Sequence, residues 1–455
     1  RNHFSKVRSG MKKNKLLPQA KNNRIGFHYY QDTLHYREVD LNFWLPELKE
    51  LGANWLVLKG VCDHAIPEPF INGLVSSNIS PIIDLECDLT YSTDPNALST
   101  LLEVYSRWGV RFINFFDKPN LRKSWRTSAW AQQDLVERFL DRYLPLANAA
   151  IDRGLTPIFP ALQPGGNFWD TAFLRTALES LERRKQMNVL QNLVLSAYAW
   201  TNGKSLNWGA GGPERWPDAR PYSTSSTSED QMGFRIYEWY QEIFKSVIQK
   251  EVPTILFQTG CYADPQAKNY IYGKKDLDIE PDLIRLVTGE KFIDPSHPDD
   301  NVESINEQVF SCNFWLLQDS HYPVNSLYNP DLTTTDTAEK IKKYVASIDI
   351  ENETRNSSKT FTPDHNHLIA HYVLLPSYEW GVSEWHLEII QPFIKKYRPT
   401  VGYSIEEASH ASHVTVIGNP YTFSEESLEE LRQNGCTVDR ISGDGISIAT
   451  QIAER

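Results

Sequence analysis

Three carboxylates in the first third of the chain have the types and the spacing that acid and base chemistry needs. Asp84 and Glu86 stand two residues apart in the apolar run 81–87, so both side chains point to one face if this run is extended. Asp117 ends a second apolar run, 111–117. Two carboxyls on neighbouring strands can act as acid and base on a glycosidic bond, about 5–5.5 Å apart in the retaining mechanism and about 6.5–9.5 Å apart in the inverting one. Asp84, Glu86 and Asp117 are therefore the candidate catalytic residues.

Hydrogen-bonding and aromatic side chains end the other apolar runs of the chain. Indole and phenol rings offer flat faces on which sugar rings stack, and amides and imidazoles donate and accept hydrogen bonds. Such a set suits a polyhydroxylated ligand. The candidate ligand-binding residues are His28, Tyr30, Lys118, Asn120, Gln163, Tyr198, Trp200, Gln258 and Trp315. The 13 Trp and 21 Tyr can equally belong to a large core, so composition alone does not identify a sugar site.

Apolar runs alternate with amphipathic stretches from Arg24 to Ser347, and this alternation would bring the candidate residues together. Parallel strands joined by crossover helices produce such a pattern, and eight units close a barrel whose sites lie at the carboxyl ends of the strands. The predicted strands are 24–30, 54–60, 81–87, 111–117, 156–162, 193–200, 253–259 and 310–318. The predicted helices include 40–51, 133–151 and 229–249, the last capped by Ser228. We expect an α/β fold, a (β/α)8 TIM barrel followed by a small C-terminal α/β domain.

The stretch 112–120, Phe-Ile-Asn-Phe-Phe-Asp-Lys-Pro-Asn, resembles the end of the fourth barrel strand in the large retaining clan of glycoside hydrolases. In that clan the strand ends in Asn-Glu-Pro-Asn or a close variant, and the Glu is the general acid and base. Pro119 and Asn120 are kept here, whereas Asp117 and Lys118 stand where Asn and Glu are expected. A lysine is protonated at neutral pH and lacks the carboxyl chemistry of a glycosidase.

The predicted seventh strand departs from the same clan in a similar way. The clan usually carries its nucleophilic Glu in Thr-Glu-x-Gly, but 256–260 reads Leu-Phe-Gln-Thr-Gly, which leaves Gln258 or Thr259 at that position. Two replaced positions imply a carbohydrate-binding pseudoenzyme on a glycosidase-like barrel.

Three other interpretations stay open. An active glycoside hydrolase could use the displaced carboxylates Asp84, Glu86 or Asp117. Asp84 and Glu86 could instead only neutralise Lys59 or Lys118. The chain could also be a structural surface or filament protein that binds copies of itself, because a basic arm at one end faces an acidic body.

Composition divides the chain into a basic arm at 1–23, the barrel at 24–348, a polar linker at 349–368 and the small α/β domain at 369–455. The last part resembles the cell-wall-binding repeat of surface proteins from Gram-positive bacteria. The matching residues are Val414-Thr415-Val416-Ile417-Gly418, 431–435, Arg440-Ile441-Ser442-Gly443-Asp444, Ala449-Thr450 and Ile452-Ala453. The resemblance implies a polysaccharide or cell-wall glycan as partner and an extracellular or cell-surface location. A generic α/β domain that packs on the barrel or makes oligomer contacts is the alternative.

Charge and motif content exclude several other classes of function. The net charge is −12, and without the seven basic residues of the arm the rest of the chain carries −19, which argues against nucleic acid as the main partner. The sequence contains no run of 18 apolar residues, so we expect no membrane span. The sequence has no His-Glu-x-x-His, EF-hand or Cys/His metal pattern and no Gly-x-Gly-x-x-Gly turn, so we expect neither a metal nor a cofactor.

The chain has five cysteines, so they cannot all pair. Cys62 and Cys87 would follow neighbouring strands of the predicted barrel, where a bridge between them is geometrically conceivable. Buried free thiols are the alternative interpretation.

Overall fold

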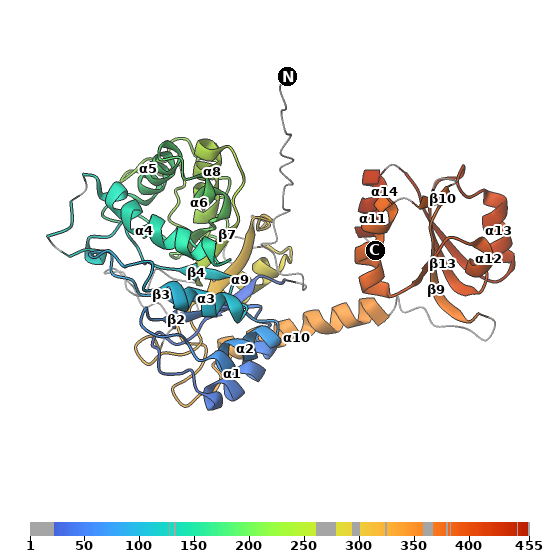
Figure 1. Cartoon of the computed structure of the whole chain (residues 1–455), viewed down its shortest axis with the longest axis horizontal. Coiled ribbons are helices and arrows are strands. Elements are labelled where there is room, and N and C mark those ends of the chain that lie inside the picture. Colours follow the sequence, from blue (N-terminus) through green and yellow to red (C-terminus); the bar gives the residue numbers. More distant parts are fainter. Residues whose placement is uncertain are drawn as a thin grey trace, which may run out of the picture. The chain divides into compact units, whose positions relative to one another are not determined.

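The computed structural model describes residues 22–126, 128–131, 133–260, 279–293, 301–323, 325–357, 367–378, 381–382, 384–443 and 445–453. It divides into two compact units, Arg1–Ser347 and Ile348–Arg455, which are described separately (Figure 1). The predicted basic arm at 1–23 lies almost wholly outside the described residues, which begin at Asn22.

The larger unit is a barrel of eight parallel strands. In sheet order they run β5-β4-β3-β2-β1-β8-β7-β6, which follows the chain around the barrel. A parallel bridge between Ile158 and Val194 closes the ring from β5 to β6. The strands are β1 (Ile25–His28), β2 (Trp55–Gly60), β3 (Ser80–Leu85), β4 (Phe112–Asn114), β5 (Thr156–Pro157), β6 (Leu195–Trp200), β7 (Thr254–Gly260) and β8 (Val309–Phe314). The predicted TIM barrel is therefore confirmed.

The interior of the barrel is filled by aromatic side chains. The rings of Trp55, Phe112 and Phe310 pack against one another with centroids 5.3–5.6 Å apart. The Trp55 indole donates a hydrogen bond to Asn22 Oδ1, and Asn22 Nδ2 donates to the carbonyl of Phe310. Because side chains fill this part of the barrel, we expect a ligand at the rim, where the carboxyl ends of the strands lie.

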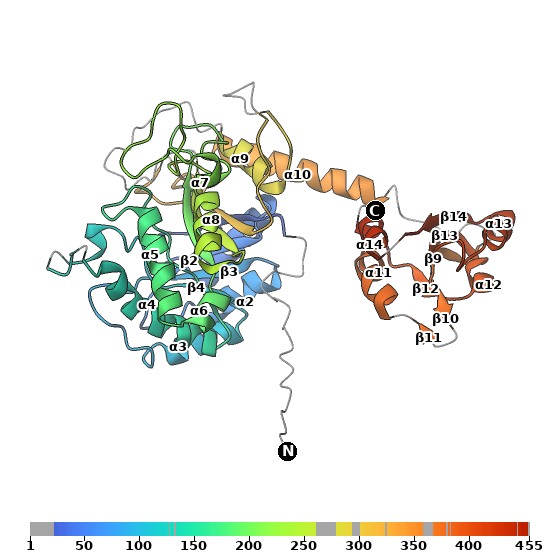
Figure 2. The ribbon, with the colours of Figure 1, turned by 90° about the horizontal axis from the view of Figure 1, so that it is seen from above.

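Helices surround the strands of the larger unit (Figure 2). They are α1 (Glu38–Glu50), α2 (Glu68–Ser76), α3 (Ser99–Arg107), α4 (Leu135–Asp152), α5 (Asp170–Arg183), α6 (Met187–Asn192), α7 (Gly212–Arg215), α8 (Ile236–Ile248) and α9 (Ile279–Thr288), with a 3-10 turn at Arg122–Ser124. Helix α10 (Asp336–Ser357) starts in this unit and ends beyond its last residue, Ser347. Helix α1 buries Leu41, Trp44 and Leu48, whose spacing puts them on one face.

Helix α8 begins at Ile236, not at the predicted cap Ser228. The chain before it forms a loop, because Asp230 accepts hydrogen bonds from Lys204 Nζ, Trp208 Nε1 and the backbone N–H of Met232. These contacts fold the segment onto the long loop that follows β6, and this loop forms part of the rim.

The smaller unit contains a parallel sheet in the order β12-β9-β13-β14 and a two-stranded hairpin. Apolar clusters cover both faces of the sheet: one includes side chains of α12 and α13, and the other includes side chains of α11 and α14. The elements are β9 (Ile369–Leu374), β10 (Ser377–Tyr378), β11 (Gly381–Val382), α11 (Glu384–Tyr397), β12 (Thr400–Gly402), α12 (Ile405–Ala408), β13 (Ala411–Ile417), α13 (Glu425–Gln433), β14 (Thr437–Ile441) and α14 (Gly445–Ala453). The predicted small α/β domain is confirmed, although the sequence did not predict α14.

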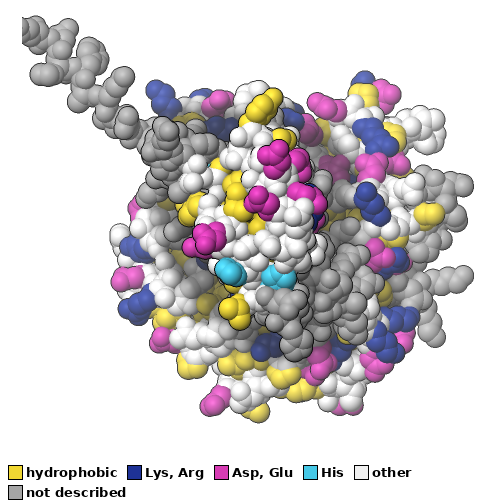
Figure 3. All heavy atoms as spheres, turned by 90° about the vertical axis from the view of Figure 1, so that its right-hand side faces the viewer, with side chains coloured by type: hydrophobic (Ala, Val, Ile, Leu, Met, Phe, Trp, Pro, Cys, Tyr) yellow, Lys and Arg dark blue, Asp and Glu magenta, His cyan; other side chains and the backbone are white. Residues whose placement is uncertain are grey.

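Acidic side chains gather on the face of this unit around α12 and α13 (Figure 3). They include Glu406 and Glu407 in the first turn of α12 and Glu425 and Glu426 in the first turn of α13, positions where the helix dipole favours negative charge.

The polar stretch at 349–368 is helical at its start. Helix α10 runs through residue 357, so residues 349–357 continue the helix that starts at Asp336. Glu351, Glu353 and Arg355 in this stretch are good helix formers, which the polar composition concealed. Within the described ranges, no helix is long and apolar enough to cross a membrane.

Candidate functional site

Lys59, at the end of β2, joins the two predicted carboxylates of the third strand. Its Nζ lies 2.8 Å from Asp84 Oδ2 and 3.4 Å from Glu86 Oε1. The strand register sets Lys59 directly beside Asp84. The Asp84 side chain is buried, whereas 66% of the Glu86 side chain is exposed. Both carboxylates thus neutralise Lys59, which was one of the interpretations of the sequence.

The electrostatics of this group favour the ion pair over acid and base chemistry. Burial alone would lower the pKa of Lys59, but the charge and hydrogen bond of Asp84 raise it above the usual range, with smaller contributions from Glu86 and Asp117. Lys59 therefore stays protonated at neutral pH, and three carboxylates act on this one cation.

Asn114, at the end of β4, completes the surroundings of Asp84. Its Nδ2 donates to Asp84 Oδ1 at 2.8 Å and to the carbonyl of Phe116 at 2.9 Å. Both Asp84 oxygens thus have a partner. Asn114 Oδ1 is buried and has no hydrogen-bond partner among the described residues.

Tyr198, on β6, contacts both residues that replace the expected Asn-Glu pair of the fourth strand. Its hydroxyl donates to Asp117 Oδ1, and the Lys118 ammonium lies 4.4 Å from the centroid of its ring. Lys118 is buried and has a φ of 46°, so its backbone occupies the left-handed region. A cation over an aromatic ring is stabilised by the ring's negative face. The position of the expected acid is therefore occupied by a buried cation.

A β-bulge at the end of β7 determines which residue faces the site. The register with β6 shifts after Ala197, so that Tyr198 pairs with Gln258 and Ala199 with Thr259. Tyr198 belongs to the interior cluster, and partners in a parallel pair face the same side, so Gln258 faces inward. Thr259 instead donates to the Ala199 carbonyl at 2.8 Å. Gln258 is the residue at the position of the expected nucleophile.

Aromatic side chains from β1, β6 and β8 form the inner wall of the site. His28 lies 5.0 Å from Trp315 between ring centroids, and Trp200 belongs to the same interior cluster as Trp315. His28 Nε2 lies 2.5 Å from the Phe257 carbonyl, so it carries the proton and Nδ1 is an acceptor. His28 Nδ1, Trp200 Nε1 and Trp315 Nε1 are buried without a partner among the described residues.

Burial keeps His28 neutral. It lowers the pKa of His28 to about 3, against the opposing effect of the Phe257 hydrogen bond and with a further contribution from the charge of Lys59. A neutral imidazole can accept a hydrogen bond from a hydroxyl, which a protonated one cannot.

Two predicted ligand-binding residues, Tyr30 and Asn120, do not join this group. Tyr30 stacks on His35 and packs edge-on against Trp44 of α1, outside the barrel interior. Asn120 is fully buried: its Nδ2 donates to the carbonyls of Gln163 and Phe168, and its Oδ1 accepts from the Gln163 N–H. The Asn120 side chain therefore holds the rim loop after β5 in place, through the backbone of Gln163 and Phe168.

Asn120→Ala is expected to destabilise the barrel by roughly 2–4 kcal/mol, because three hydrogen bonds of about 0.5–1.5 kcal/mol each are lost. Urea unfolding followed by tryptophan fluorescence measures the change. Asn167→Ala is the matched control, since Asn167 Oδ1 accepts a bond from the Arg122 N–H at the exposed surface. An equal loss for both variants would contradict the role assigned to Asn120.

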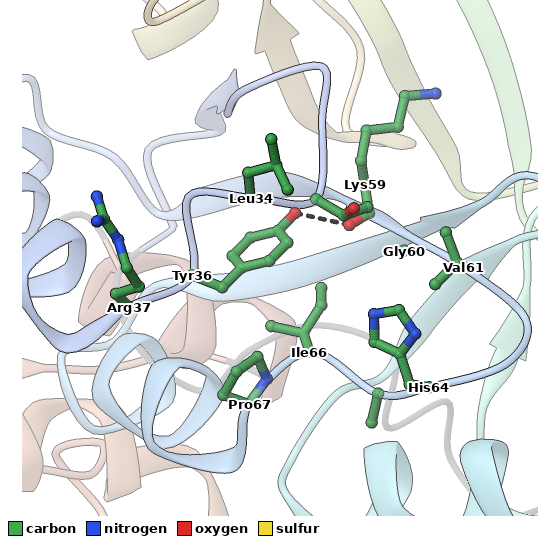
Figure 4. A pocket seen from close by; sticks show the side chains of 11 residues that line it. Leu34, Tyr36, Arg37, Lys59, Gly60, Val61, His64, Ile66 and Pro67 are labelled. Atoms are coloured by element: carbon green, nitrogen blue, oxygen red, sulfur yellow. Dashed lines mark hydrogen bonds between the residues drawn. The ribbon is translucent and has the colours of Figure 1, made fainter.

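A separate pocket of about 220 Å³ lies beside this group (Figure 4). It is formed by the loops that follow β1 and β2 and is lined mainly by apolar side chains, including Leu34, Val61 and Ile66. Tyr36 donates a hydrogen bond to the Lys59 carbonyl at its floor, while the Lys59 ammonium points away from it. The pocket and the carboxylates thus share Lys59 but lie on different sides of it.

Sequence reasoning did not select Asn114 and Lys59 as site residues. Asn114 had a usable signal, because it alternates with Phe112 on one face of its strand. Lys59 was one of two lysines that the sequence offered as partners of Asp84 and Glu86, and the structure shows that Lys59 is the one that joins them. Among the described residues, no group of His, Cys, Asp and Glu side chains is arranged to hold a metal ion.

Comparison with known proteins gives no family assignment. No protein-family model matches the chain, and no curated protein matches it. Among solved structures, the chain is similar to a monomeric β-xylosidase from Caulobacter crescentus, with 14% identity and a TM-score of 0.42 over 71% of this chain and 68% of the xylosidase.

Two further solved structures show a similar degree of likeness. An endo-β-1,3-glucanase of glycoside hydrolase family 128 from Sorangium cellulosum has 11% identity and a TM-score of 0.40 over 70% of this chain and 97% of its own. A D-psicose 3-epimerase from Clostridium cellulolyticum has 10% identity and a TM-score of 0.35 over 72% and 98%. Because all three scores lie below 0.5, the barrel is identified from the strand order of the chain itself.

Proposed function

We propose that the chain is a carbohydrate-binding protein that uses the carboxyl-end rim of its barrel and lacks the hydrolytic chemistry of the glycosidases that its sequence resembles. One observation carries the proposal. Four buried polar atoms at the inner wall have no partner among the described residues: His28 Nδ1, Asn114 Oδ1, Trp200 Nε1 and Trp315 Nε1. Buried polar groups are costly without a hydrogen bond, and a polyhydroxylated ligand offers both donors and acceptors.

The carboxylates support binding over hydrolysis. Asp84 is buried and both of its oxygens already have a partner, Lys59 and Asn114, which suits a structural ion pair better than an acid or a nucleophile. Lys118 and Gln258 stand where the resembled clan carries its two Glu residues, and neither can act as a carboxyl acid or nucleophile.

An extracellular or cell-surface location and a cell-wall glycan as ligand belong to the same proposal. They rest on the resemblance of the C-terminal domain to a wall-binding repeat. Self-association through the basic arm and the acidic body remains part of the proposal as well.

A hydrolase that uses Glu86 and Asp117 is the second candidate. Both side chains are exposed at the rim and both carboxylates act on Lys59.

One experiment separates the candidates: the purified full chain is incubated with β-glucans, xylans and bacterial wall preparations, and co-sedimentation and reducing-end release are both read. Binding without release supports the binding protein. Release that Glu86→Gln or Asp117→Asn abolishes would establish the hydrolase instead.

Gln258→Ala is expected to weaken co-sedimentation with the bound glycan about 2- to 10-fold, because one inward-facing hydrogen-bonding group is lost. Isothermal titration with an oligosaccharide of that glycan measures the change. Gln191→Ala is the matched control, because Gln191 is exposed on α6, which precedes β6 and lies toward the opposite end of the barrel. Unchanged affinity for Gln258→Ala would remove β7 from the binding site.

A further inference from the structure

Two cysteine side chains meet at the rim of the barrel. Cys62 Sγ lies 3.2 Å from Cys87 Sγ, and both are free thiols that are partly buried. The parallel register pairs Gly60 at the end of β2 with Leu85 at the end of β3. Each cysteine follows its strand end by two residues, so the two cysteines lie at the same height above the sheet and their sulfur atoms meet. The other two described cysteines, Cys312 and Cys436, are buried.

We propose that Cys62 and Cys87 are a disulfide-forming pair that covalently joins the loops after β2 and β3. A disulfide has a sulfur–sulfur distance of about 2.05 Å, so the two atoms need to approach by only about 1 Å. Cys62 lies in the loop after β2, where the backbone accommodates such a shift more easily than a paired strand does, whereas the Cys87 N–H still donates to the Phe115 carbonyl.

The bond forms by thiol–disulfide exchange with a small-molecule disulfide such as oxidised glutathione. The Cys62 thiolate attacks one sulfur of the reagent, forms a mixed disulfide and releases one glutathione thiolate. The Cys87 thiolate then attacks Cys62 Sγ, which forms the Cys62–Cys87 bond and releases the second glutathione. The two thiol protons pass to the two leaving thiolates, so oxidation of two protein thiols balances reduction of one disulfide.

The environment favours Cys62 as the attacking residue. A hydrogen bond from Cys87 lowers the pKa of Cys62, and the same contact together with burial raises the pKa of Cys87. The thiolate is the nucleophile in exchange, so the residue with the lower pKa reacts first.

The bond would fix the surroundings of Lys59 from both sides. Cys87 follows Glu86, which lies 3.4 Å from Lys59, and Cys62 follows Val61, which lines the pocket beside Lys59. This inference does not depend on the proposed glycan binding, because its primary measurement is covalent.

The test uses the full chain with Cys261→Ser, which removes a cysteine that lies outside the described residues. The protein is incubated with oxidised glutathione, alkylated and cleaved by a Glu-specific protease, because a cut after Glu86 separates Cys62 from Cys87 whereas trypsin finds no site between them. We expect a cross-linked pair of peptides, two hydrogens lighter than the reduced pair, and loss of two titratable thiols.

Two variants and one physical measurement complete the test. In Cys87→Ser the reaction should stop at a glutathione adduct on Cys62, and Cys62→Ser should give no cross-link. The oxidised protein should melt several degrees above the reduced protein, since a closed loop constrains the unfolded chain. Complete alkylation of both cysteines after oxidation, with no cross-linked peptide, would overturn the proposal whether or not the protein binds a glycan.

Discussion

Lys59→Met is expected to lower the free energy of unfolding of the barrel by about 3–5 kcal/mol, because it leaves the Asp84 carboxylate buried without its cation. Asp84 is 4% exposed and 2.8 Å from the Lys59 ammonium, and Asn114 alone cannot neutralise its charge. Urea unfolding at pH 7, followed by circular dichroism and tryptophan fluorescence, measures the loss.

Two further variants separate this pair from a general effect of removing a lysine. Lys245→Met removes an ammonium from an exposed pair with Glu242, and its unfolding midpoint should stay within experimental error of the wild type. The double variant Lys59→Met with Asp84→Asn removes both charges and should recover a large part of the loss. If the loss of unfolding free energy in the double variant equals the sum of the losses in the two single variants, the ion pair does not stabilise the site.

His28→Gln is expected to remove one source of acid instability from the barrel. In the folded protein burial lowers the pKa of His28 to about 3, whereas in the unfolded chain a histidine titrates near its usual value of about 6.5. Below about pH 6.5 the unfolded chain binds a proton that the folded protein does not, so stability falls as the pH drops from about 6.5 to about 3. Between pH 7.5 and pH 4 this contribution amounts to roughly 3 kcal/mol.

The measurement is the difference in unfolding free energy between wild type and His28→Gln at pH 7.5 and at pH 4. On going from pH 7.5 to pH 4, the wild type should lose roughly 3 kcal/mol more of its unfolding free energy than His28→Gln loses. Gln191→Ala, which removes no titrating group, should show the same pH dependence as the wild type. A difference that does not change with pH would mean that His28 titrates alike in both states.

The architecture could be predicted from the sequence because the strands are buried on both faces. Runs such as 54–60 and 253–259 have apolar centres with polar residues only near their ends, and their spacing by amphipathic stretches leaves few topologies other than a barrel. The alternation of Asp84 and Glu86 similarly placed both at the end of one strand. The continuation of α10 through residues 349–357 and the late start of α8 were not predicted, because helix formers in a polar stretch decide the first and tertiary contacts of Asp230 decide the second.

The site could be predicted only in outline. Strand ends locate the rim, but a sequence does not show where a side chain turns after its strand ends. Tyr30 turns outward onto α1, and Asn120 bonds to the backbone of the next loop, although both sit where a ligand contact was expected. The shift in register that points Gln258 inward depends on pairing between β6 and β7, which no local pattern encodes.

The barrel strands are not joined equally well around the ring, because few backbone hydrogen bonds connect β5 to β6. Strand β5 spans only Thr156–Pro157, and the ring is completed there by the bridge between Ile158 and Val194. Pro157 lacks an N–H and can only accept, as it does from Val194. With so few interstrand bonds to break, local opening costs least along this line. The seam between β5 and β6 is therefore the place where we expect local opening of the ring, with backbone amides there exchanging with solvent before those of β2 and β3.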